Sequence, residues 1–227
     1  MKKFLISEYT RLKPVFLTCS MSMILVAFRM KISHDLHYLF LDWNLFLAII
    51  PLVMACWLYE RKSAKNKTLW ALGFMAWLLF LPNAPYILTD FIHLSYSPKK
   101  WFAFDLLMIS SFAVSGLVCG LISVKIIQDQ LMNGFSRKSR RLAEGLIFLL
   151  CGYGIYLGRF WRYNSWYLLT DPFRLIKDCF ATLAHPLVHW QIWLFTIGFG
   201  AFLHVIYFFS SAYFHQTPKN NVYVNEG

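Results

Sequence analysis

The hydrophobic residues of this chain form six long apolar runs separated by short polar segments. Most runs approach the roughly 20 residues that an α-helix needs to cross the hydrocarbon core of a bilayer. The first run is the shortest, and Arg29 and Lys31 follow it instead of a small-residue cleavage site. It is therefore predicted to be an uncleaved helix that extends through Met30. The runs cover residues 15–28, 43–58, 69–88, 102–127, 142–158 and 190–212.

This pattern predicts an all-α integral membrane bundle of about six transmembrane helices. We expect one membrane domain over residues 1–215 and a flexible polar tail over 216–227. Composition agrees, because 58% of the residues are hydrophobic and only 15% are charged, whereas soluble domains carry about 25% charged residues. The lipid bilayer is thus the first predicted partner of the chain.

The formal net charge of +11 is explained by topology. Of the 22 Lys and Arg residues, 14 lie on the side that holds both termini and eight on the other. The positive-inside rule then places both termini in the cytoplasm, so the basic charge gives no reason to expect a nucleic-acid partner. The five cysteines are widely spaced and odd in number, which predicts neither a zinc site nor a disulfide framework.

The third apolar run contains a predicted break at Leu81-Pro82-Asn83-Ala84-Pro85-Tyr86. Pro82 and Pro85 each remove a helix hydrogen bond and leave a carbonyl one turn earlier without its donor. Backbone broken at membrane depth is tolerated only against protein or a wet cavity. Asn83 is expected to bond the freed carbonyls, and a ligand-facing amide is the alternative.

Charged and polar residues collect where several helices are predicted to reach the outer face. At about 1.5 Å per residue, Asp42, Asp90, Asp105 and Arg159 each lie about 27 to 32 Å from the inner end of their helix. One reading is that these are ordinary interfacial charges, and Arg can reach the head groups by snorkelling. The other is an outer-face binding site, in which Asp90 and Arg159 are expected to belong to one charge-compensated cluster. Its candidates are Asp42, Asn44, Asn83, Tyr86, Asp90, His93, Asp105, Arg159, Arg162 and Asn164.

Asp90 and His93 are the candidates for catalysis. Three residues apart, they share one face of a helix and could form an acid–base pair or bind a metal. Two potential ligands do not make a metal site, and His185 with His189 lacks a matching carboxylate, so no metal and no cofactor is assigned.

Two further patterns concern packing. Residues 172–184 have apolar positions at helical spacing after the N-cap pattern Thr170-Asp171-Pro172, which predicts an amphipathic helix on the outer leaflet between the fifth and sixth helices. Gly116 with Gly120, and Gly154 with Gly158, are small-residue pairs four apart. Such pairs indicate close helix packing.

The stretches LFLPNAPYILTDFIHL (79–94) and GIYLGRFWRYNSWYLLTDP (154–172) resemble the hallmark segments of a bacterial membrane family known as domain of unknown function 1361. The resemblance extends over most of the second to fifth helices. It implies a multipass protein of the bacterial cytoplasmic membrane and assigns no activity.

Three functions stay open. The first is a non-catalytic binding, sensing or accessory role in which the outer polar layer binds a ligand or a partner membrane protein. The second is a membrane enzyme in which Arg159 and Arg162 bind an anionic lipid or lipid-linked substrate while Asp90 or His93 transfers protons. The third is a small transporter, which would need polar residues through the inner half, where the sequence offers mainly Ser, Thr and Cys.

Overall fold

A computed structural model of the chain describes residues 9–61, 67–131, 134–163 and 170–216. In these ranges the regular elements are all helices, and six of them are long and apolar enough to cross a membrane. The predicted all-α multipass architecture is confirmed. The predicted tail lies outside the described residues from 217 onward.

The helices follow the apolar runs and extend beyond them at most ends. The first helix begins before its apolar run and continues past Arg29, so this arginine lies within a helix and not in a loop. In chain order the elements are α2 (Tyr9–Ser33), α3 (Leu39–Glu60), α4 (Lys67–Phe80), α5 (Asn83–Tyr86), η2 (Ile87–Tyr96), α6 (Phe102–Leu131), α7 (Arg137–Arg159), α9 (Pro172–Ala184) and α10 (Trp190–Gln216).

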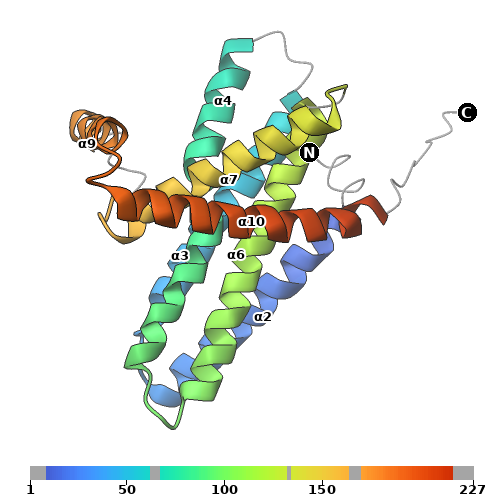
Figure 1. Cartoon of the computed structure of the whole chain (residues 1–227). Helices are drawn as coiled ribbons and strands as arrows, with labels where there is room; N and C mark the ends of the chain where they lie inside the picture. Colours follow the sequence, from blue (N-terminus) through green and yellow to red (C-terminus); the bar gives the residue numbers. More distant parts are fainter. Residues whose placement is uncertain (1–8, 62–66, 132–133, 164–169, 217–227) are drawn as a thin grey trace, which may run out of the picture.

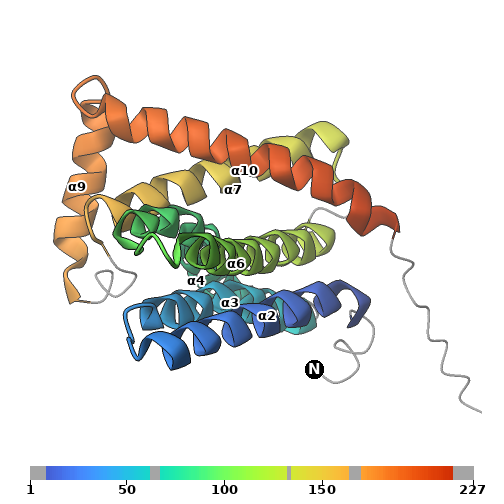
Figure 2. The ribbon, with the colours of Figure 1, turned by 90° about the horizontal axis from the view of Figure 1, so that it is seen from below.

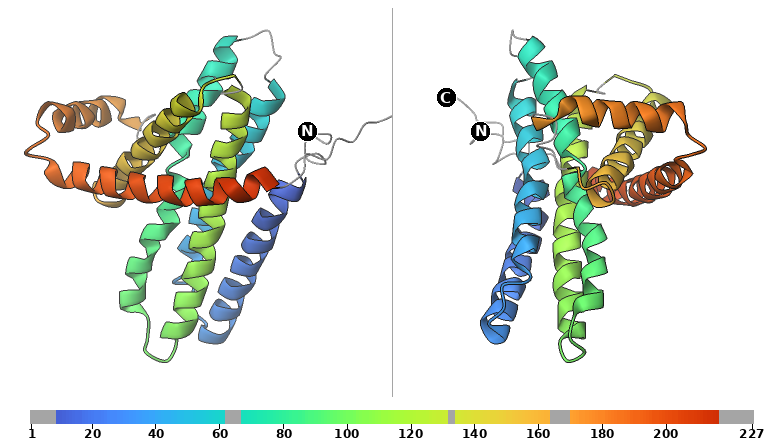
Figure 3. Two further views of the ribbon diagram at one scale, coloured as in Figure 1. Left: turned by 45° about the vertical axis from the view of Figure 1, so that its right-hand side comes forward. Right: turned by 90° about the vertical axis from the view of Figure 1, so that its left-hand side faces the viewer.

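The helices form three layers. Figure 2 shows α2 and α3 on one side, α6 in the middle and the α7–α10 pair on the other. Helix α10 packs mainly on α7 and lies across α6 at a steep angle, as Figures 1 and 3 both show. In Figure 1 the direction of α7 falls between those of α6 and α10.

The predicted break in the third span is present. The α-helix ends at Phe80, and after the short α5 the chain continues as a 3₁₀ helix, η2. Asn83 Nδ2 donates a 3.0 Å hydrogen bond to the carbonyl oxygen of Phe80. That carbonyl has no α-helical donor, because the backbone N–H of Ala84 bonds Leu81 instead. The amide of Asn83 therefore bonds a carbonyl at the break, as expected, although Phe80 is not one of the two residues four positions before Pro82 and Pro85.

Both predicted glycine pairs pack on this broken segment. A Cβ atom at Gly116 of α6 would overlap the carbonyl oxygen of Ala84, and one at Gly154 of α7 would lie 2.7 Å from Pro82. A Cβ atom at Gly158 would lie nearest to the ring of Tyr86, at 3.4 Å. Because glycine has no side chain, α6 and α7 can both pack closely against the irregular backbone.

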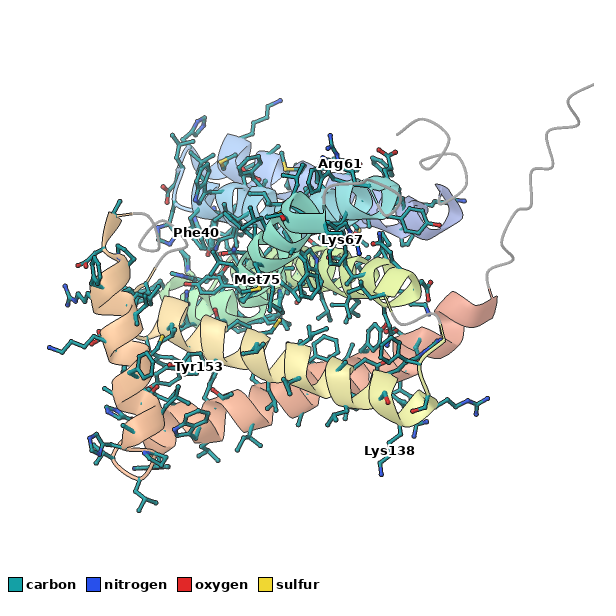
Figure 4. The ribbon with its side chains drawn as sticks, turned by 90° about the horizontal axis from the view of Figure 1, so that it is seen from above. Phe40, Arg61, Lys67, Met75, Lys138 and Tyr153 are labelled. Atoms are coloured by element: carbon teal, nitrogen blue, oxygen red, sulfur yellow. The ribbon has the colours of Figure 1, made fainter. Side chains whose placement is uncertain are left out.

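The predicted amphipathic helix is α9, and it stands apart from the bundle (Figure 2). Asp171 caps it by accepting a hydrogen bond from the backbone N–H of Arg174. Thr182 anchors it, since its hydroxyl bonds Tyr153 on α7 at 2.8 Å and its carbonyl accepts from Trp193 on α10. Figure 4 shows Tyr153 between α7 and α9. The apolar side chains Phe173, Ile176, Phe180 and Leu183 are all exposed, as a helix lying in the membrane surface requires.

Candidate functional site

Asp90 lies in η2 and is completely buried. The guanidinium of Arg159, the last residue of α7, reaches it with Nη1 3.2 Å from Asp90 Oδ1. Asn44 of α3 donates to the other carboxylate oxygen, Oδ2, at 2.7 Å. Two separate elements, α3 and α7, therefore supply the partners of a carboxylate that lies on a third, η2. A buried charge needs such compensation, because an isolated carboxylate in an apolar interior is very costly.

Two features hold Arg159 in place. Its Nη2 donates to the backbone carbonyl of Thr89 at 2.9 Å, next to the carboxylate it pairs with. Its Nη1 also lies 3.4 Å from the hydroxyl of Tyr86, and its guanidinium carbon is 5.7 Å from the centre of the Tyr86 ring. A cation at the C-terminus of a helix is further stabilised by the helix dipole.

A cavity of about 200 Å³ lies beside this ion pair. Asn44 and Tyr86 belong to both the pair and the cavity wall, so the cavity meets the polar cluster at one end. Trp43 and Leu79 are 53% and 37% exposed, so the cavity wall reaches the apolar outer surface of the helices. The lining residues are Trp43, Asn44, Leu47, Leu79, Pro82, Asn83, Tyr86, Gly154, Leu157, Gly158, Tyr163 and Leu175.

Asp105 does not join this cluster, contrary to the single layer expected from the depth argument. It is completely buried and pairs with Arg29 of α2, whose Nε lies 2.6 Å from Asp105 Oδ1. Tyr38 and Ser97 both donate to the second oxygen, at 2.8 and 2.6 Å. The cluster joins the end of α2 to the start of α6, at the bottom of Figure 1.

Sequence reasoning missed Arg29 because it was read as the flank of a short helix. Its guanidinium carbon lies 4.8 Å from the ring centre of Trp101 and 5.4 Å from that of Tyr38. Burial and the hydrogen bond to Asp105 raise the pKa of Tyr38 to about 12. The depth argument applied to the first helix would have placed Arg29 near the level of Asp105.

The other candidates have separate positions. His93 lies against Phe40 with ring centres 4.5 Å apart and ring planes tilted by 46°, and no hydrogen bond within the described residues joins it to Asp90. Asp42 lies in the first turn of α3, where its Oδ1 is buried with no hydrogen-bond partner in the described part of the chain. Asn164 lies outside the described residues. In those ranges no three side chains of the metal-binding types come together.

Arg162 lines a second cavity, of about 450 Å³, between the end of α7 and α9. Its backbone has φ of 58°, in the left-handed region that is uncommon for residues other than glycine. The hydrogen bond that the hydroxyl of Tyr163 donates to Asp178 raises the pKa of Tyr163. The cavity is lined by Trp161, Arg162, Tyr163, Arg174, Asp178, Ala181 and His189.

A polar cluster near the C-terminal end of α6 was also missed. The hydroxyl of Tyr207 on α10 donates to Gln128 Oε1 at 2.6 Å, and Gln128 Nε2 donates to Glu144 on α7. Lys125 and Asp129 form an ion pair along α6. The fourth apolar run was predicted to end at residue 127, whereas α6 stays helical to Leu131 and so includes Gln128 and Asp129.

Neither the search of curated proteins nor the search of solved structures found a significant match. The model of a family described as "Protein of unknown function (DUF1361)" matches residues 43–206. This range begins after α2 and includes Asn44, Asp90 and Arg159. Because the match covers more than half of the sequence, the chain belongs to the DUF1361 family.

Proposed function

We propose that this protein is a non-catalytic lipid-binding protein, which takes part of a membrane lipid into the 200 Å³ cavity beside Asp90 and Arg159. The observation that carries the proposal is a largely apolar cavity whose adjoining charges already neutralise each other. Ligand pockets are commonly apolar with a few polar groups that set orientation. A cavity of this size holds part of a lipid, and the remainder stays in the bilayer.

The position of the cavity supports a ligand that arrives from the membrane. Trp43 and Leu79 line the cavity and are also exposed on the outer surface of α3 and α4. Leu175 of α9 closes another side, and α9 exposes its apolar face. An entrance between apolar helices suits a lipid better than a water-soluble ligand.

The proposed location is the bacterial cytoplasmic membrane, with both termini in the cytoplasm and the cavity toward the outer leaflet. The unequal distribution of Lys and Arg supports this orientation. A membrane normal close to the axis of α7 would tilt α6 and α10 to opposite sides (Figure 1). Transmembrane helices commonly tilt by tens of degrees, so all six could cross together.

The enzyme hypothesis receives less support from the same geometry. Both oxygens of Asp90 are engaged, by Arg159 and by Asn44, and His93 lies against Phe40 with no hydrogen bond to that carboxylate within the described residues. A general acid or base must reach the proton that it transfers. An arginine that already compensates Asp90 is also a poor receptor for a second anion.

Native mass spectrometry of the full chain, released from detergent after extraction from membranes, tests the proposal. The wild type should retain one lipid, whose mass is that of an unmodified membrane lipid. Leu175→Trp, which enlarges a side chain in the cavity wall, should lose it. Ile176→Trp is the matched control, because Ile176 is the next residue of α9 and is 49% exposed.

A wild type without bound lipid, or a Leu175→Trp variant that retains lipid as well as Ile176→Trp, would contradict lipid binding in this cavity. A retained lipid that is chemically altered would instead favour the enzyme. Thermal unfolding of both variants verifies that each is folded.

A further inference from the structure

The second cavity combines positive and negative groups, which the first does not. Arg162 and Arg174 supply two guanidinium groups to its lining, and Asp178 supplies a carboxylate. Within the described residues, neither arginine side chain forms an ion pair. A ligand with a phosphate group would therefore meet two guanidinium groups that form no salt bridge within the described residues.

The carboxylate side of the cavity has the features of an ammonium site. The hydroxyl of Tyr163 donates to Asp178 Oδ2 at 2.5 Å, which favours the ionised carboxylate and fixes its position. The rings of Trp161 and Tyr163 lie 6.4 Å apart, centre to centre, beside it. Aromatic faces attract cations, so these rings and the carboxylate together suit a positively charged group.

The two cavities are neighbours. Tyr163 belongs to both walls. On α9, Leu175 faces the first cavity, whereas its neighbour Arg174 and Asp178 one turn later face the second. A molecule that extends along α9 would thus pass from an apolar chamber to a chamber with both signs of charge.

We infer that the bound lipid is a phospholipid with a zwitterionic head group, its phosphate at Arg162 and Arg174, its ammonium at Asp178, and an acyl chain in the first cavity. This inference rests on the proposed function and adds the chemical class of the lipid. Phosphate and ammonium in one head group match the two signs of the lining, whereas an anionic lipid would leave Asp178 without a cation. Helix α9, with Phe173 and Phe180 exposed, lies where such a head group would be.

The test is a competition between phosphatidylethanolamine and phosphatidylglycerol for the full chain in detergent, followed by native mass spectrometry. We expect the wild type to retain phosphatidylethanolamine about tenfold better, the effect of one charge-assisted hydrogen bond. Asp178→Asn, which preserves an acceptor for Tyr163, should reduce this preference to about one and still bind lipid. Arg174→Gln should weaken binding of both lipids.

Lys177→Gln is the matched control for Arg174→Gln, since it also removes one positive charge from α9, at an exposed position. It should change neither the affinity for lipid nor the preference between the two lipids. Equal retention of both lipids by the wild type, or an unchanged preference in Asp178→Asn, overturns the zwitterionic assignment. If lipid is then still lost in Leu175→Trp, only this inference fails. If the wild type holds no lipid, the proposed function fails with it.

Discussion

Arg159 Nη1 lies 3.2 Å from Oδ1 of Asp90, a carboxylate with no exposed surface, although 69 residues separate the two in sequence. Removing one partner of a buried pair leaves the other uncompensated, which typically costs about 3 to 5 kcal/mol. Asp90→Asn and Arg159→Gln should therefore each lower thermal stability in detergent substantially. The double variant should lose less than either single variant.

Arg137→Gln is the control for this cycle, because Arg137 is an exposed arginine in the first turn of α7. It should leave the melting temperature nearly unchanged. Small and additive losses from the two single variants would mean that the pair is not coupled in the folded protein.

The glycine contacts predict which substitutions the broken segment tolerates. Gly154→Ala should destabilise the protein, because its Cβ would lie 2.7 Å from the ring of Pro82. Gly145→Ala, on the same helix, has nothing within 4 Å of the new Cβ and should be neutral or stabilising by up to about 1 kcal/mol. Thermal unfolding of both variants in one detergent measures the difference. Equal effects would mean that α7 does not approach Pro82 closely.

The pair of Tyr38 and Asp105 predicts a dependence of stability on alkaline pH. Burial and the hydrogen bond to Asp105 raise the pKa of Tyr38 to about 12 in the folded protein, against about 10 in an unfolded chain. The resulting stabilisation is complete below pH 10 and is lost as the pH rises from about 10 to 12. Wild type should therefore lose more stability over this range than Tyr38→Phe.

Unfolding curves recorded between pH 8 and 11.5, within the tolerance of the detergent, measure this difference. Tyr96→Phe is the control, because Tyr96 is 75% exposed, and it should follow the wild type. Parallel curves for wild type and Tyr38→Phe would count against the buried hydrogen bond.

Topology is predicted from charge and is open to direct measurement. Reporter domains fused after Lys62 or Arg140 should be cytoplasmic, and those fused after Ser97 or Asp178 should be exterior. A cysteine-labelling assay on intact cells gives an independent readout. Inversion of either pair of fusions would place the cavity toward the inner leaflet and remove the support for an outer-leaflet ligand.

The sequence by itself determined the number of spans, the break at Pro82 and Pro85, and the amphipathic helix after Asp171. Each of these depends on local physics. A long apolar run has one stable arrangement in lipid, a proline removes its own hydrogen bond, and helical periodicity shows within a dozen residues. The glycine pairs likewise indicated close packing, although not the segment on which they pack.

The sequence predicted that Asp90 and Arg159 share a cluster, but only the tertiary structure decided that Asp105 pairs elsewhere, with Arg29. Depth along a helix placed Asp90, Asp105 and Arg159 near one end, but depth gives no lateral position. Asp105 pairs with Arg29 because α2 packs on α6, and Asp90 pairs with Arg159 because glycines of α7 let it approach Pro82 and Tyr86, just before η2. Lateral neighbours are set by side-chain packing between helices distant in sequence, and the cavity beside Asp90 exists only where those helices meet.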